Sequence, residues 1–325
     1  MRPGSVFAAL AACLALAAFA ASAAETYPAR PVRFIVPIAP GGGADITART
    51  VAQKLSSMWG QHFVVDNRSG GTGTIGLDIA AKSRADGYTI TFVTGSHAAR
   101  QAIQKKLPYD LMKDFAPVTQ LTAQSYVLVI NPAIPAKTIQ ELVSHANGKP
   151  GGLTYGSSGQ GSLQHLSGAL LATSVKANLL HVPYKGGGPA LIDVLSGQLS
   201  MIFATPLESV PHIKAGRLRP IAVSGPRRSP AMPALPTVAE TGVPGYEVTN
   251  WYGVLAPAAT PKAIVARLNG GFLEALKAPE MTDRFLKDGV DVVGSTPEQF
   301  RAHVRAEIQR FERAVTAAGI KPSDE

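Results

Sequence analysis

Near the start of the chain the sequence reads Val32-Arg33-Phe34-Ile35-Val36-Pro37 and then Pro40-Gly41-Gly42-Gly43-Ala44-Asp45. The first run is rich in apolar and β-branched residues, which is typical of a buried strand. Proline and three glycines then end the strand. Beyond them, apolar residues return at helical spacing, at Ala48, Val51, Leu55 and Met58. The stretch therefore predicts a strand, a glycine turn and a helix, in that order.

Outward from this unit, strand and helix patterns alternate along most of the chain. Further strands are predicted over residues 63–65, 88–93, 126–130, 153–155, 179–182, 201–204 and 220–223, and helices over 73–81, 138–146, 162–174, 189–195 and 207–215. Threonine–proline pairs at 260–261 and 296–297 predict two more helices, each capped by its threonine. The second of these helices has an apolar stripe of Phe300, Val304, Ile308, Phe311 and Val315, and Gly319 is placed to end it.

This alternation predicts an α/β protein whose sheets are mostly parallel and flanked by helices. Two such blocks, a proline-rich surface loop over residues 226–244 and a helical tail point to two lobes. Chains of this class often cross between lobes twice. We therefore expect one lobe from residues 25–122 plus 246–325, and the other from residues 123–245.

Composition narrows the classes of function. The 325 residues are 46% hydrophobic and only 16% charged, which excludes a disordered chain. Basic residues exceed acidic ones, giving a formal charge of +9, but they are scattered and form no patch for nucleic acid. A single cysteine excludes a disulfide scaffold and cysteine-based zinc sites, and seven dispersed histidines lack metal-ligand spacing. We expect no metal and no cofactor.

The first 24 residues predict a secretory signal peptide. Arg2 precedes an apolar run over residues 6–20, and small residues over 21–24 offer cleavage after Ala23 or Ala24. Export to the periplasm follows. The spelling Leu10-Ala11-Ala12-Cys13 is an alternative, because it resembles a lipoprotein signal. The apolar run continues past that cysteine, however, where a soluble tether should begin.

Three loops share one design, in which a strand leads through glycines into a helix start. They span residues 37–45, 155–162 and 182–189. Glycine lets the backbone approach a ligand, and a helix start offers unpaired N–H groups with a positive dipole end. Each loop alone is compatible with an ordinary tight turn before a capped helix. The first two together, at corresponding places in two lobes, favour an anion site.

Other motifs point to chemistry that the surrounding residues do not support. Residues 71–76 spell G-x-G-x-x-G, but no acidic residue follows the next strand as a dinucleotide site requires. The loop over 156–162 lacks the lysine of a phosphate loop. Ser162 and His165 are neighbours on a predicted helix and suggest an exported hydrolase, yet the G-x-S-x-G elbow is absent. A capping serine is the favoured interpretation.

Several stretches carry a resemblance to a known family. They include the whole of residues 27–45, Leu107-Pro108-Tyr109-Asp110, Lys113-Asp114-Phe115-Ala116-Pro117-Val118, Tyr155-Gly156-Ser157-Ser158-Gly159-Gln160-Gly161-Ser162 with His165-Leu166, His181-Val182-Pro183-Tyr184-Lys185-Gly186, Pro211-His212-Ile213-Lys214-Ala215-Gly216 and Pro236-Thr237-Val238-Ala239-Glu240. In this order and over nearly the whole chain after residue 24, the protein resembles the Bug-type solute receptors of tripartite tricarboxylate transporters.

The resemblance implies a two-lobe periplasmic-binding-protein-like fold of type II, hinged around a central cleft. It implies a non-enzymatic, monomeric receptor that binds a small carboxylate and delivers it to the membrane permease subunits of such a transporter. A receptor that feeds a signalling partner is the alternative. Neither the resemblance nor the residues identify the carboxylate.

Carried onto this chain, the family's ligand-binding positions fall on Ala39, Pro40, Gly41, Gly42, Gly43, Asp45, Ser96, His97, Ser157, Ser158, Gly159, Gly161, Ser162, His165, Tyr184 and Thr205. Asp45 either accepts from a ligand amine or caps its helix, and the cap is favoured. Arg100 stands near the Ser96-His97 turn where the family commonly has asparagine and proline. Whether Arg100 or Lys185 contacts the ligand stays open.

Overall fold

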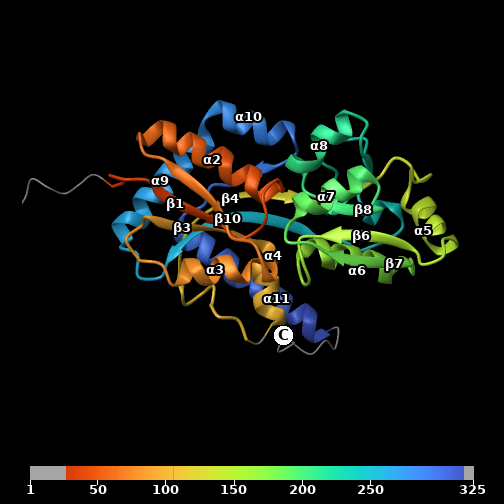
Figure 1. Cartoon of the computed structure of the whole chain (residues 1–325), viewed down its shortest axis with the longest axis horizontal. Coiled ribbons are helices and arrows are strands. Elements are labelled where there is room, and N and C mark those ends of the chain that lie inside the picture. Colours follow the sequence, from red (N-terminus) through yellow and green to blue (C-terminus); the bar gives the residue numbers. More distant parts are fainter. Residues whose placement is uncertain (1–26, 105, 318–325) are drawn as a thin grey trace, which may run out of the picture.

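The first sheet combines strands from both ends of the chain (Figure 1). A computed structural model describes residues 27–104 and 106–317 of the 325. The sheet has the strand order β11-β4-β10-β3-β1-β2. Its members are β1 (Val32–Val36), β2 (Phe63–Asn67), β3 (Thr89–Thr94), β4 (Phe115–Ser125), β10 (Thr249–Pro257) and β11 (Asp291–Val292).

Helices cover both faces of this sheet. On one face lie α2 (Gly43–Trp59), α9 (Lys262–Lys277) and α10 (Pro279–Lys287), and on the other lie α3 (Thr74–Ala81), α4 (Gly95–Ile103) and α11 (Pro297–Ala317). Alternation along β1 explains why the strand is apolar throughout. Phe34 and Val36 join the core under α2 and α9, whereas Ile35 joins the core under α3 and α11.

The second sheet is built from the middle of the chain. Its order is β7-β6-β8-β5-β9, with β5 (Val127–Ile130), β6 (Leu153–Ser157), β7 (Leu179–Pro183), β8 (Met201–Ala204) and β9 (Arg219–Val223). The cores on its two faces are formed with α5 (Ile139–Gly148) and α6 (Leu163–Val175) on one side and α7 (Gly187–Ser196) and α8 (Pro206–Lys214) on the other. The α/β class with helix-flanked sheets is therefore confirmed.

Pairing within both sheets is mixed rather than mostly parallel. β1 pairs with β2 and β3, and β6 with β7 and β8, in parallel. The remaining pairs are antiparallel, because β4, β5, β9 and β10 belong to the segments that cross between the sheets. Two of these strands, β4 and β10, were not predicted, and the Ser96-His97 segment expected as a loop is the first turn of α4.

The two crossings lie side by side. β4 runs on through Tyr126 into β5, and the chain returns through Val248 into β10. Ser224 ties the two crossings together. Its backbone N–H donates to Tyr126 O (2.9 Å), and its hydroxyl donates to Val248 O (2.5 Å). This junction joins the two sheets.

Helix ends show where the local predictions held. Thr296 caps α11 as expected, and Thr138 caps α5; each hydroxyl accepts from the N–H three residues on. Pro261, rather than Thr260, is the cap of α9. Phe300, Val304 and Ile308 are buried on α11. The predicted signal peptide, Gly319 and the side chain of Val315 lie outside the described residues.

In the described part of the chain, no helix is both long and apolar enough to cross a membrane.

Candidate functional site

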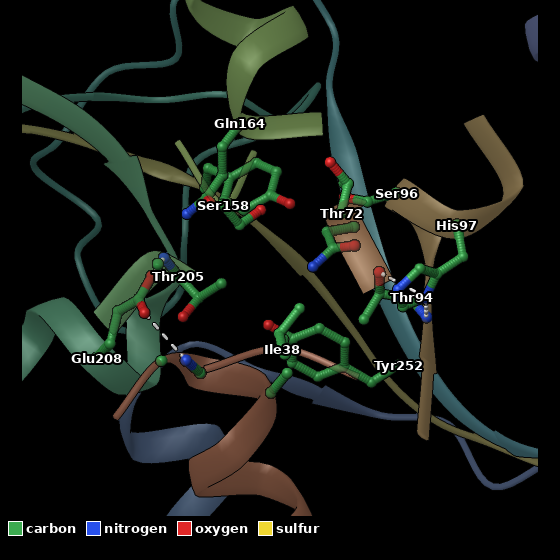
Figure 2. A pocket seen from close by; sticks show the side chains of 16 residues that line it. Ile38, Thr72, Thr94, Ser96, His97, Ser158, Gln164, Thr205, Glu208 and Tyr252 are labelled. Atoms are coloured by element: carbon green, nitrogen blue, oxygen red, sulfur yellow. Dashed lines mark hydrogen bonds between the residues drawn. The ribbon is translucent and has the colours of Figure 1, made fainter. Parts of the chain in front are cut away.

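A chamber lies between the two sheets, where loops from both lobes meet (Figure 2). Its volume is about 30 Å³. First-lobe residues come from the loop after β1, from the turn before α3, from the end of β3 with α4, and from β10. Second-lobe residues come from the starts of α6, α7 and α8 and from the loop after β6. The chamber therefore lies at the C-terminal ends of parallel strands in both lobes, where ligand sites of open α/β sheets are found.

The loop after β1 presents the N-terminus of α2 to this chamber. Gly42 is the N-cap and Gly43 the first helical residue, and both line the chamber. Asp45 turns away from it. Its carboxylate accepts from Gly41 N–H (3.0 Å) and Arg49 Nε (3.0 Å), and from Asn67. Asp45 thus holds the shape of its own loop, as the favoured interpretation predicted.

The start of α4 forms the second wall. His97 Nδ1 accepts from the N–H of Thr94 (3.0 Å), closing a capping box in which histidine takes the usual place of glutamate. Burial, together with the positive charge of Arg100, lowers the pKa of His97 to about 3. His97 is therefore neutral and carries no positive charge toward a ligand. Ser96 is buried, and its hydroxyl accepts from Leu163 N–H (3.0 Å) across the cleft.

The loop after β6 faces these groups from the second lobe. Ser162 caps α6, and its hydroxyl accepts from the backbone N–H of His165 (3.2 Å). The ring of His165 is engaged elsewhere, because its Nδ1 accepts from Gly161 N–H (3.1 Å). The nucleophile–base pair that would make a hydrolase is therefore not formed, and the capping interpretation holds.

His165 and His181 stack beside this loop, with ring centroids 3.9 Å apart. His181 Nε2 lies 2.6 Å from the Ser157 hydroxyl, which also bonds to Gly159. Burial and the neighbouring His165 lower the pKa of His181 to about 4. These side chains contact the loop from outside the chamber. Ser158 is the loop residue that lines the chamber.

The lobes touch at several points around the chamber, and the remaining 30 Å³ has room for about one water molecule, so a dicarboxylate requires the lobes to lie slightly further apart than here. Ala39 N–H donates to Lys185 O (2.9 Å) and the Thr72 hydroxyl to Gln160 O (2.8 Å). Arg100 Nη1 also reaches Gln160 O (3.3 Å). Arg100 bridges the lobes from outside the chamber, and Lys185 contributes its backbone while its side chain is exposed.

Glycines make this close approach sterically feasible. A Cβ on Gly188 would lie 2.6 Å from Pro40 O and 2.7 Å from Gly42 N. A Cβ on Gly43 would lie 2.0 Å from the Thr205 hydroxyl. Both clashes are with the opposite lobe. The glycine loops over residues 37–45 and 182–189 are thus matched surfaces, which explains why both are glycine-rich.

The predicted site residues divide into three groups. Six line the chamber: Gly42, Gly43, Ser96, His97, Ser158 and Thr205. Four form lobe-to-lobe contacts at its edge: Ala39, Pro40, Gly41 and Gly159. Six support the loops from outside: Asp45, Ser157, Gly161, Ser162, His165 and Tyr184, the last through a hydrogen bond to Asp193.

Ten further lining residues were not among the predicted site residues. They are Ile38, Ala44, Thr72, Thr94, Tyr126, Gln164, Gly187, Glu208, Asn250 and Tyr252. Asn250 and Tyr252 belong to β10, which was not predicted, whereas Tyr126 opens a predicted strand that was given no role in the site. Glu208 was hidden because it stands three residues after Thr205, the spacing of a capping box. In this part of the chamber only Thr205 was predicted as a site residue, because it directly follows a predicted strand.

The chamber is lined mainly by uncharged groups, with the carboxyl group of Glu208 among them. No lysine or arginine is among the described residues that line it. Two buried amide oxygens in the lining have no hydrogen-bond partner: Gln164 Oε1 and Asn250 Oδ1. Buried polar atoms are normally paired, so these are positioned for a guest. Nowhere in the described ranges do three or more potential metal-ligating side chains gather into a metal site.

Comparison with known proteins agrees with this geometry. The family model described as the tripartite tricarboxylate transporter family receptor matches residues 47–320. The periplasmic binding protein BugD is 30% identical, with a TM-score of 0.87 over 91% of this chain and 99% of its own. An R. palustris protein solved with adipate is 39% identical, with a TM-score of 0.86 over 91% and 100% of the two chains.

MatC from Rhodopseudomonas palustris, solved with bound malate, is 31% identical. Its TM-score is 0.84, and the match covers 89% of this chain and all of MatC. The likeness extends over both lobes and the two crossings between them. The chain therefore belongs to the tripartite tricarboxylate transporter family of periplasmic solute receptors, a family of binding proteins rather than enzymes.

Proposed function

We propose that the chamber captures a small carboxylate in the periplasm and that the closed protein delivers it to the permease subunits of a tripartite tricarboxylate transporter. The observation that carries this proposal is that helix starts and a hydroxyl group from both lobes meet at the chamber, at Gly43, Gly187 and Ser158, where they can donate hydrogen bonds to an anion. Adipate and malate, seen in two relatives, are the first candidate ligands.

The relative position of the two lobes can tell the permease whether ligand is bound. We infer that residues 25–122 with 246–325 form one lobe and residues 123–245 the other, and that the protein acts as a monomer after removal of residues 1–24. Contacts such as those from Ala39 to Lys185 and from Gly43 to Glu208 exist only when the lobes are closed. A ligand that contacts both lobes shifts the population toward this form, which the permease can distinguish from the open one.

Binding is tested on protein that has been unfolded and refolded to remove any ligand carried from the cell. Adipate, malate and a panel of mono-, di- and tricarboxylates are compared with their neutral amides by thermal shift. A ligand at 100 times its Kd stabilises the fold by about 2.7 kcal/mol. Stabilisation by a carboxylate but not by its amide is the expected result, and no stabilisation by any carboxylate contradicts the proposal.

A further inference from the structure

The chamber closes around one carboxyl group of the protein itself. The Glu208 side chain is 4% exposed, and its Oε1 accepts from Thr205 N–H (2.6 Å) within the second lobe. Its Oε2 accepts from Gly43 N–H (3.0 Å) across the cleft (Figure 2). Gly43 begins α2, so Glu208 occupies a helix N-terminus that favours an anion.

Glycines hold this carboxyl group tightly. A Cβ on Gly187 would lie 2.9 Å from Glu208 Oε2, and one on Gly42 would lie 3.2 Å from the same atom. These two residues come from opposite lobes. The position of the Glu208 carboxyl group is therefore defined by closure, and a guest in the chamber must lie close to it.

Two unpartnered amide oxygens in the same lining are also acceptors. Gln164 donates its Nε2 to Phe203 O (2.9 Å), which leaves Oε1, an acceptor, without a partner. Asn250 Oδ1 also lacks one. An ionised carboxylate can only accept hydrogen bonds. A carboxylate guest therefore adds acceptors and negative charge to a lining that, in its described residues, has neither lysine nor arginine.

We propose that closing over a carboxylate takes up one proton from solvent at Glu208, whose O–H then donates to the ligand. The inference rests on the proposed function. The proton adds to one Glu208 oxygen, and no bond in the ligand forms or breaks. Carboxyl groups that cannot both stay ionised side by side share a proton in this way.

Burial already favours the neutral form, because it raises the pKa of Glu208 against the opposing effect of the hydrogen bonds from Thr205 and Gly43. The other titratable groups around it come from α2, α4, α8, β10 and the crossing before β5: Asp45, His97, His212, Tyr252 and Tyr126. Burial lowers the pKa of both histidines and raises the pKa of both tyrosines, and Asp45 is paired with Arg49. Glu208 is the group left to take up the proton near neutral pH.

Calorimetric titration measures this proton directly. Adipate and malate are titrated into the refolded protein between about pH 6.5 and about pH 8, where both ligands are ionised, in phosphate and in Tris. The difference in heat between buffers gives the protons taken up. We expect uptake approaching one proton per ligand bound, with affinity falling by up to about tenfold for each pH unit.

The Glu208→Gln variant assigns the proton. Glutamine is also found at this position of a capping box, so α8 keeps its start. The variant should bind with no proton uptake and with an affinity independent of pH. Glu141→Gln is the matched control, because Glu141 stands at the same position of the capped helix α5 but is exposed. It should keep the proton uptake of the wild type.

The outcomes separate the two proposals. Binding of adipate or malate by the wild type without a buffer-dependent heat overturns the inference and leaves the proposed function intact. Proton uptake that persists in Glu208→Gln overturns the assignment to Glu208. Failure of every carboxylate to bind overturns the proposed function and the inference with it. The wild-type result decides the uptake even if the glutamine variant does not fold.

Discussion

Single residues around the chamber do their work mainly through backbone contacts. Serine and histidine are common catalytic residues, yet the side chains of Ser162 and His97 each accept a hydrogen bond from a nearby backbone N–H at a helix start. Glu208 caps α8 and also crosses the cleft to Gly43. Helix caps therefore set both the local structure and the surface that meets a ligand.

Replacing Ser162 with alanine should destabilise the protein without any effect on ester turnover, because the hydroxyl is a cap. A lost serine cap costs about 1 kcal/mol. Urea unfolding of Ser162→Ala measures this cost. Ser174→Ala is the control, since Ser174 is exposed near the end of the same helix. Equal stability of the two variants would contradict the capping role.

His97 should make the protein sensitive to acid. Its pKa is lowered to about 3 in the folded state, so the unfolded chain binds this proton first as pH falls below about 6.5. The free energy of unfolding should then fall with pH, by up to about 1.4 kcal/mol per unit from this group, until pH reaches the folded pKa. Stability is fully retained above about pH 6.5.

Urea unfolding at several pH values compares the wild type with His97→Gln. Glutamine can replace the capping-box side chain, so the variant should show a shallower loss of stability in acid. His62→Gln, at an exposed histidine, should follow the wild type. An unchanged slope in His97→Gln would show that this histidine does not cause the acid sensitivity.

At the scale of elements, the sequence predicted the units with one simple period and missed those with mixed composition. β1 and the helix that follows it are clear because a β-branched run meets glycine and then an apolar helical stripe. β4 was missed because Pro117 and alternating threonines and glutamines resemble a loop. Pro117 is tolerated because the pairing with β10 shifts register next to it.

β10 was missed for a related reason. Gly253 interrupts it, and a Cβ there would lie 2.1 Å from Phe300 of α11. The glycine therefore follows from tertiary packing, which local patterns do not contain. Because β10 carries one of the crossings, missing it also hid Asn250 and Tyr252 as chamber residues. The glycine loops, by contrast, could be found because the turns that form them are local.

Gly188→Ala should prevent closure while leaving each lobe folded. Its Cβ would meet the backbone of residues 40–42 in the opposite lobe at 2.6–2.7 Å, and backbone cannot move aside as a flexible side chain can. We expect carboxylate affinity to fall by about 100-fold or more, a loss of about 2.7 kcal/mol or more in binding free energy. Calorimetric titration measures the affinity.

Gly270→Ala is the matched control for this change. It is also a helical glycine, with nothing within 4 Å of the added Cβ. It should keep wild-type affinity and gain roughly 0.5–1 kcal/mol of stability from helix propensity. Wild-type affinity in Gly188→Ala would show that binding does not require the contact between the two glycine loops.

The whole molecule is arranged so that closure, rather than any one side chain, builds the site. The two sheets are joined where Ser224 bonds to both crossings, at Tyr126 and Val248, and we expect the lobes to rotate about this junction. Hydrogen bonds between the lobes, such as that from Thr72 to Gln160, require the lobes to be close together. A ligand that bonds to loops of both lobes should therefore favour the closed form of the whole protein.

Small-angle X-ray scattering measures whether the two lobes close on the ligand in solution. The refolded protein is measured with and without the carboxylate that stabilises it, next to Gly188→Ala under the same conditions. The radius of gyration of the wild type should fall when the carboxylate is added, and that of Gly188→Ala should stay at the larger value. A wild-type protein that binds the carboxylate with no change in radius of gyration would contradict capture by closure of the two lobes.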